Sequence, residues 1–136
     1  MKKLLICVLS CVVLITTPAK AETVLYCQSE LATGFIRDNG AWKTGKFAQK
    51  RWTIKFNDNY SIAEGLTTFS MECVVPYPSA AELIFCVHKR GSHETFLYNL
   101  NKNRFTFSSV KDFGYVDDPT GEASTDVLYA GSCTSF

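Results

Sequence analysis

Apolar and polar residues alternate along much of the chain, and the alternation is clearest between residues 95 and 109. Phe96 and Tyr98 occupy every second position before a polar turn, and Phe105 and Phe107 do the same after it. A period of two puts successive side chains on opposite faces of a strand, so each arm can bury one face. The pattern predicts a β-hairpin whose two arms share an apolar face.

Further short strands are expected on the same grounds, separated by turn residues. Asp38-Asn39-Gly40 predicts a tight turn and a hairpin between Phe35 and Trp42, because Asn and Gly tolerate a positive φ. The remaining expected strands are 23–27, 31–37, 51–56, 60–63, 84–87, 113–116 and 126–133.

Helical signals are weak. Residues 80–83 favour a helix, but the β-branched and aromatic residues that follow them favour a strand. At most a short helical turn is therefore expected near 79–83. Eight to ten short strands with no long helical period predict an all-β fold, either a small antiparallel β-barrel or a sandwich.

The first 21 residues read as a targeting segment. Two lysines precede the apolar run Leu4–Ile15, and Ala19-Lys20-Ala21 closes it with small residues around a cleavage point. The run of 12 residues is short against the ~20 that a spanning helix needs. We expect residues 1–21 to be a cleavable signal peptide and residues 22–136 to form a single β-domain, periplasmic or secreted. A lipoprotein cut before Cys11 is the less favoured alternative, because the apolar run continues beyond it.

Removal of this segment changes the charge balance. Lys2, Lys3 and Lys20 leave with it, so 11 basic residues remain against 13 acidic ones, a net charge of −2. No run of like charge stands out, which argues against nucleic acid as a partner. No membrane span is expected after signal removal.

Four cysteines remain in the expected mature chain, Cys27, Cys73, Cys86 and Cys133. An even number in an exported chain implies two disulfides. Three pairings are open, and we favour Cys73 with Cys86, across a short loop, and Cys27 with Cys133, which would join the first strand to the last. The cysteines lack C-x-x-C spacing, so neither a metal site nor a cofactor is expected.

No catalytic constellation is visible. His88 and His93 lie across an expected turn, and no motif such as G-x-S-x-G accompanies them. Asp117 and Asp118 are adjacent in an acidic turn, a poor arrangement for a paired acid and base. No catalytic residue is therefore predicted, although a small hydrolase stays open as an alternative.

The candidate binding residues lie in and beside the basic loop that follows residue 45. Loops carry contact residues because strand faces are needed for the core. Charge in this loop would suit an acidic partner or a glycan, and the neighbouring aromatic rings would add apolar contact. The candidates are Trp42, Lys46, Phe47, Lys50 and Arg51. A second idea is an aromatic stacking platform drawn from Trp42, Tyr60, Tyr77, Tyr115 and Tyr129.

Short motifs spread over most of the expected mature chain resemble a group of short exported proteobacterial proteins of unknown function. They are Tyr26-Cys27, Gly34-Phe35, Gly40-Ala41-Trp42, Arg104-Phe105, Gly114-Tyr115 and Gly131-Ser132-Cys133. The chain is also similar, as a class, to periplasmic lysozyme inhibitors in size, signal, cysteine use and β content. The signal segment, the aromatic-rich strands and the missing catalytic constellation together predict a non-catalytic binding or inhibitory module of the bacterial envelope, whose expected partner is an envelope protein or a glycan. The alternative is a small hydrolase acting on envelope glycans or esters.

Overall fold

The computed structural model describes residues 22–88, 93–110 and 125–135. The predicted signal segment, the expected strand 113–116 and the acidic turn 117–122 lie outside these residues. The described parts contain nine strands: β1 (Thr23–Asp38), β2 (Ala41–Lys46), β3 (Arg51–Phe56), β4 (Ile62–Glu64), β5 (Met71–Val74), β6 (Leu83–His88), β7 (Glu94–Asn99), β8 (Arg104–Val110) and β9 (Thr125–Ser135).

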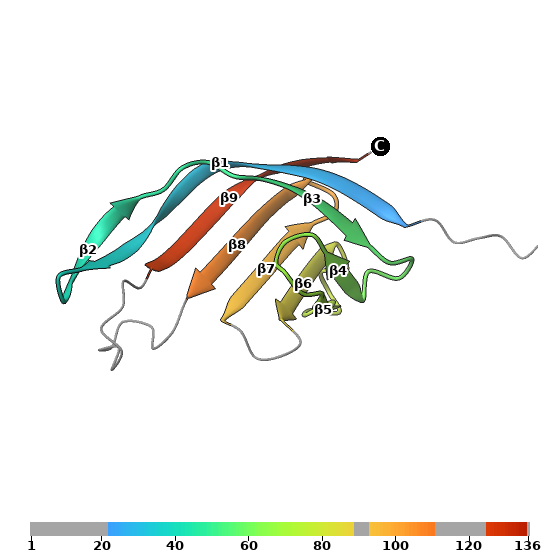
Figure 1. Cartoon of the computed structure of the whole chain (residues 1–136). Coiled ribbons are helices and arrows are strands. Elements are labelled where there is room, and N and C mark those ends of the chain that lie inside the picture. Colours follow the sequence, from blue (N-terminus) through green and yellow to red (C-terminus); the bar gives the residue numbers. More distant parts are fainter. Residues whose placement is uncertain (1–21, 89–92, 111–124, 136) are drawn as a thin grey trace, which may run out of the picture.

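The strands form one antiparallel sheet in the order β2-β1-β3-β4-β5-β6-β7-β8-β9, and β1 also pairs with β9. This last pairing closes eight strands into a barrel and leaves β2 as an extra strand beside the second half of β1 (Figure 1). The all-β prediction is therefore confirmed, and the barrel, rather than the sandwich, is the architecture. Because closure pairs strand edges, most of the sheet presents no open edge.

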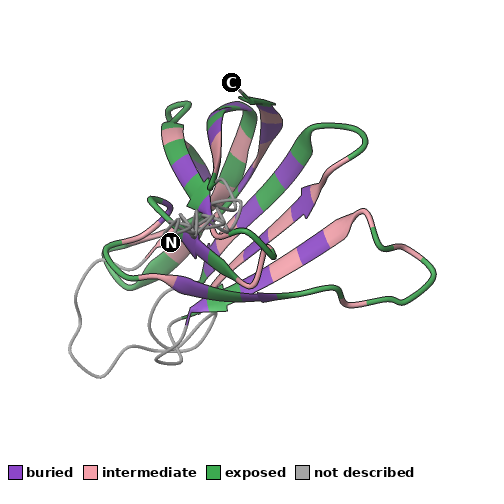
Figure 2. Cartoon of the chain, turned by 90° about the vertical axis from the view of Figure 1, so that its right-hand side faces the viewer, coloured by how far each residue is buried: buried purple, intermediate pink, exposed green. Residues whose placement is uncertain are grey.

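The predicted hairpin is confirmed as β7 and β8. Phe96 lies opposite Phe107, and Tyr98 lies opposite Phe105, in a continuous register. All four side chains are buried, and burial alternates along the strands as Figure 2 shows. One face of each strand thus fills the barrel while the other faces solvent.

The two strands expected over 23–27 and 31–37 are a single strand, β1. Its register with β9 shifts between Ser29 and Leu31, where Glu30 is the additional residue of a β-bulge. A bulge breaks the period-two pattern without breaking the strand, so the sequence pattern suggested two elements where the chain forms one.

Tight turns account for two other predictions. Asp38 pairs with Ala41 around Asn39 and Gly40, whose φ angles of 52° and 79° confirm the predicted turn. Near residues 79–83 the chain forms no helix. The amides of Ala80 and Leu83 instead donate to carbonyls three residues earlier, at 3.0 Å each, and β6 begins at once.

The two disulfides have the favoured pairing. Cys27 is bonded to Cys133, and Cys73 to Cys86. The members of each pair lie directly opposite one another on neighbouring strands. The first disulfide therefore joins β1 to β9 at the point where the barrel closes, and the second joins β5 to β6.

Aromatic side chains fill much of the interior. The rings of Phe56, Phe96 and Tyr98 lie with centroids 6.2–6.5 Å apart, and all three are at most 1 % exposed. The Tyr98 hydroxyl donates to Asn103 at 2.8 Å. Burial raises the pKa of this hydroxyl, with a smaller contribution from Tyr60. Of the fifteen aromatic residues in the described parts of the chain, six are buried in the core and three more, Phe47, Trp52 and Tyr60, are half-buried against it.

Candidate functional site

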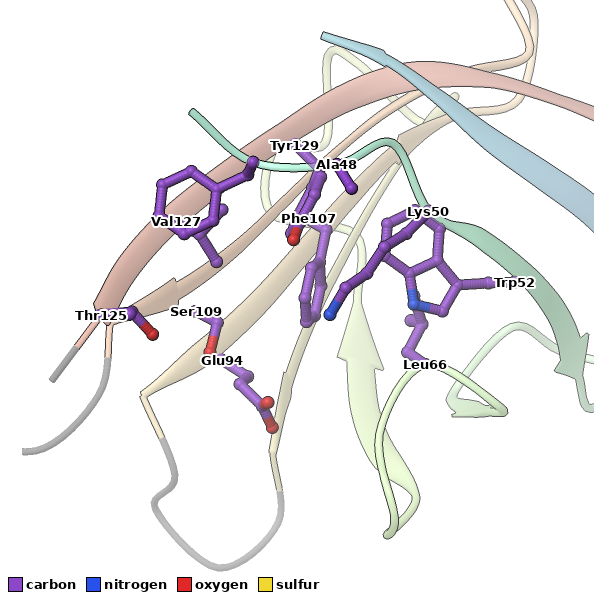
Figure 3. A pocket seen from close by; sticks show the side chains of 11 residues that line it. Ala48, Lys50, Trp52, Leu66, Glu94, Phe107, Ser109, Thr125, Val127 and Tyr129 are labelled. Carbon is purple, nitrogen blue, oxygen red and sulfur yellow. The ribbon is translucent and has the colours of Figure 1, made fainter. Parts of the chain in front are cut away.

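A pocket of about 320 Å³ opens at one end of the barrel, where β7 and β9 begin and β8 ends (Figure 3). We call it the mouth pocket. Its lining combines apolar side chains with groups able to form hydrogen bonds. The apolar residues are Phe47, Ala48, Trp52, Leu66, Phe107, Val127 and Tyr129, and the polar ones are Lys50, Glu94, Ser109 and Thr125.

Three rings form the aromatic wall of the mouth pocket. The Trp52 ring meets Tyr129 edge-on at 5.4 Å and Phe107 at 5.7 Å between centroids. Phe107 and Tyr129 are buried, whereas Trp52 and the neighbouring Phe47 are half-buried. Trp52 and Phe47 therefore offer ring surface to a ligand, while the other two rings hold Trp52 in place.

The backbone of Lys50 is fixed by Ser29, the fully buried residue beside the bulge. The Lys50 amide donates to the Ser29 hydroxyl at 2.7 Å. The Ser29 amide and hydroxyl in turn donate to the Lys50 carbonyl at 2.9 and 3.3 Å. These hydrogen bonds fix the backbone of Lys50 on both its amide and its carbonyl side, and so fix the position from which its exposed side chain extends. We call this arrangement the Ser29 clamp. Its ammonium nitrogen lies 5.5 Å from the centroid of the Tyr129 ring, a cation–π distance.

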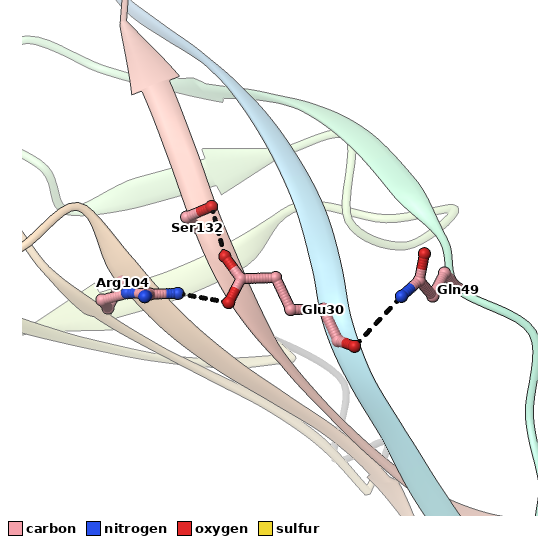
Figure 4. A network of polar contacts seen from close by, with 4 residues as sticks. All are labelled: Glu30, Gln49, Arg104 and Ser132. Atoms are coloured by element: carbon pink, nitrogen blue, oxygen red, sulfur yellow. Dashed lines mark hydrogen bonds and ion pairs between the residues drawn. The ribbon is translucent and has the colours of Figure 1, made fainter.

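The additional residue of the bulge, Glu30, forms a second clamp (Figure 4). Its carboxylate accepts hydrogen bonds from Arg104 of β8 and from Ser132 of β9, and its carbonyl accepts one from Gln49 at 3.0 Å. The hydrogen bond from Arg104, followed by that from Ser132, lowers the pKa of Glu30. The segment before β3 forms one rim of the mouth pocket. Glu30 and Ser29 together connect this segment to the seam of the barrel, which is the pairing of β1 with β9.

Polar groups lie on the opposite side of the mouth pocket. Glu94 and Ser109 face each other in the β7–β8 register, and Thr125 begins β9. Figure 3 shows their oxygen atoms on the side of the pocket away from the 47–50 segment. The site thus combines an ammonium group, a carboxylate, two hydroxyls and exposed ring surface within one small volume.

The candidate binding residues separate in the structure. Phe47 and Lys50 both line the mouth pocket. Trp42 and Lys46 belong to β2 and do not contribute to the lining, while Arg51 lines a different groove of about 450 Å³ with Tyr26, Gln28 and Thr53. The basic loop is thus one half of the site.

The other half of the site was not singled out from the sequence. Trp52 and Phe107 read as ordinary members of alternating strands, and Glu94 as a solvated carboxylate in the turn before the hairpin, although Tyr129 was a candidate for the stacking platform. Only the closure of the barrel brings β3, β7, β8 and β9 to one mouth. A carboxylate at the first residue of β7 was the one local signal available.

The histidines lie apart from this site. His88 is 8 % exposed and packs edge-on against Phe69 at 5.4 Å, and His93 precedes β7 on the surface; neither lines the mouth pocket. Within residues 22–88, 93–110 and 125–135 no group of three or more His, Cys, Asp or Glu side chains could hold a metal ion. The same residues contain no helix with the length and hydropathy needed to cross a membrane.

No family model, curated protein or solved structure matches this chain. The resemblance to exported proteins of unknown function stays a prediction, and the function is argued from the geometry of the site.

Proposed function

We propose that this protein is an exported, non-catalytic binding module of the bacterial envelope and that its ligand enters the mouth pocket. The observation that carries the proposal is the clamped Lys50 beside exposed aromatic surface. Binding sites combine apolar walls with a few fixed polar groups, and they work best on rigid elements. Here the bulge in β1 holds the rim of the pocket through Ser29 and Glu30.

Binding accounts for the lining better than hydrolysis does. An esterase needs a nucleophile within hydrogen-bond reach of a base, and most glycosidases need a pair of carboxylates. Among the described residues, the mouth pocket is lined by one carboxylate, Glu94. The four cysteines of the domain are consumed in disulfides, and His88 lies in the barrel wall against Phe69. The rival hydrolase predicts turnover of glycan or ester substrates that collapses when His88 or His93 is replaced.

Two features support export. The N-terminal 21 residues have the pattern of a cleavable signal peptide, and the protein contains two disulfides. Disulfides persist mainly in oxidising compartments such as the periplasm. An inhibitory role is the narrower form of the proposal, in which the bound partner is an enzyme of the envelope.

The test blocks the mouth pocket with a bulky side chain. Ala48 is exposed on the rim, so Ala48→Trp should fill the pocket without disturbing the core. Ala81→Trp is the matched control, because Ala81 is equally an exposed alanine but lies in the turn before β6. Each oxidised protein is immobilised and exposed separately to the protein and glycan fractions of a bacterial envelope.

We expect saturable binding of one fraction by the wild type and Ala81→Trp, and at least a tenfold weaker response for Ala48→Trp. Thermal melts should show both variants folded. Equal binding by wild type and Ala48→Trp would place the ligand elsewhere and overturn the proposal, as would the absence of saturable binding to either fraction.

A further inference from the structure

We infer that the ligand of the mouth pocket is a carbohydrate, bound through one pyranose unit that stacks on Trp52 and hydrogen-bonds to Lys50 and Glu94. The inference rests on the proposed function and names its ligand class. It draws on three independent properties of the pocket: its size, its ring surface and the presence of both an ammonium group and a carboxylate in its lining.

The size of the mouth pocket favours a single compact group. Its volume of about 320 Å³ lies at the lower end of the ~300–1,000 Å³ found for small-molecule sites. Two of the rings that line it, Phe107 and Tyr129, belong to the packed core of the barrel, which leaves little room for an extended apolar chain. A single sugar ring at the end or edge of a glycan can enter such a pocket.

The exposed ring surface suits the apolar face of a sugar. Trp52 is held by edge-on and tilted contacts with Phe105, Phe107 and Tyr129 at 5.4–5.7 Å, so its orientation is fixed before a ligand arrives. The negative face of an aromatic ring attracts the weakly positive C–H groups of a sugar. A fixed ring also avoids the entropy cost of ordering a side chain on binding.

The polar groups discriminate between ligand classes. Lys50 and Glu94 place groups of opposite charge in one lining, and an apolar ligand would remove both groups from water at a high cost. Sugar hydroxyls both donate and accept, so they can donate to the Glu94 carboxylate and accept from the Lys50 ammonium. The hydroxyls of Ser109 and Thr125 add further donors and acceptors in the same lining.

A protein partner fits these observations less well. Specific protein interfaces generally bury more than about 1,000 Å² in total. The polar residues of the mouth pocket, Lys50, Glu94, Ser109 and Thr125, line a volume of only about 320 Å³. A protein ligand is accordingly the outcome of the test that would overturn the sugar assignment.

The test is isothermal titration calorimetry with three soluble probes: an N-acetylglucosamine trimer, peptidoglycan disaccharide fragments and a neutral glucose trimer. The first two carry the N-acetylated sugars of envelope glycans, so the third separates a general sugar site from one that needs the acetamido group. The variants are Lys50→Met and Glu94→Gln, which keep side-chain size while removing the charge. Lys102→Met and Glu64→Gln are matched controls, since both residues are exposed and outside the pocket lining.

At least one probe should bind the wild type and both controls, and each pocket variant should bind about tenfold more weakly or worse, because each loses a hydrogen bond to a charged group. Sugar binding that neither pocket variant weakens would overturn the assignment of these residues. If no probe binds while envelope protein is captured by the wild type and lost in Ala48→Trp, the carbohydrate class fails and the proposed function survives. Absence of binding in both experiments would reject both.

Discussion

Two neighbouring residues at the bulge of β1 act on the site without being part of its lining. Ser29 clamps the backbone of Lys50, and Glu30 reaches Arg104 and Ser132 on the far side of the seam. Bulges are frequent beside functional sites because they redirect the chain locally. In this barrel the hydrogen bonds of the two residues connect the pocket rim to β1, β8 and β9.

The Glu30 clamp makes stability depend on pH in a defined direction. The folded pKa of Glu30 is lowered by its hydrogen bonds to Arg104 and Ser132, so the folded state favours the carboxylate. The stabilisation is therefore present above the ordinary glutamate pKa, about 4.3, and is lost as the pH falls through the lower folded value.

We predict that Glu30→Gln is less stable than the wild type at pH 7, modestly so because the carboxylate is about half exposed. The gap in the free energy of unfolding should shrink between pH 5 and pH 3 and close below the folded pKa. Urea unfolding at several pH values measures it. A gap that is constant across this range would contradict the role of the carboxylate charge.

At the level of single residues, the sequence pattern identified part of the site. Phe47 and Lys50 could be proposed because a basic loop with an aromatic residue is a local pattern. Trp52 and Phe107 could not, because an aromatic residue on the buried face of a strand has the same pattern whether it lies mid-barrel or at the mouth.

Among the elements, the seam between β1 and β9 carries the most specific requirement. A Cβ atom at Gly131 would lie 2.0 Å from the carbonyl oxygen of Gln28 and 2.8 Å from the Cα of Ser29. Both contacts are with backbone, which cannot move aside as a flexible side chain would. Glycine at this position allows β9 to approach the bulge closely.

We therefore predict that Gly131→Ala lowers the melting temperature by at least about 5 °C, the effect of roughly 1–3 kcal/mol of overpacking in a domain of this size. Thr134→Ala on the exposed side of the same strand is the control and should change it little. Thermal melts followed by circular dichroism compare them. A Gly131→Ala protein as stable as the control would show that the seam tolerates a side chain.

The two disulfides should differ in their contributions. Cys27 and Cys133 are 106 residues apart, whereas Cys73 and Cys86 are 13 apart. In the chain-entropy account, the longer loop contributes nearly 5 kcal/mol and the shorter about 3 kcal/mol.

Replacing both cysteines of the seam pair by alanine should thus lower the free energy of unfolding more than replacing the other pair. Urea denaturation of the two double variants measures the difference. Equal losses, or a larger loss for the short loop, would show that the seam disulfide is not the principal constraint on the unfolded chain.

Sequence patterns predicted most elements because alternation is a local property. The β7–β8 hairpin and the turn at Asn39 and Gly40 follow directly from it. The division of β1 into two strands was wrong, since a bulge within one strand and a turn between two strands disturb the alternation in the same way. The hydrogen bonds to β9 decide between them, and these are not visible in a local pattern.

For the whole molecule, the closure of the sheet creates the site. Strands in which apolar and polar residues alternate are equally compatible with a barrel and with a sandwich, so the sequence did not decide between the two architectures. The β1–β9 pairing decides the question and brings the segment 47–52 beside residues 94, 107–109 and 125–129. These groups are up to about eighty positions apart in the chain. The mouth pocket is accordingly a product of topology, and its function depends on the rigid seam beneath it.

The central claim, that a carbohydrate binds at the barrel mouth, is tested most directly by a nuclear magnetic resonance titration of the labelled protein with the N-acetylglucosamine trimer and peptidoglycan disaccharide fragments. We predict amide shift changes concentrated at Lys50, Trp52, Glu94, Ser109 and Val127, with the β7–β8 turn at residues 100–103 unchanged. Shift changes confined to the other groove, which Tyr26 and Arg51 line, would contradict the account. So would the absence of shift changes with either probe at millimolar concentration.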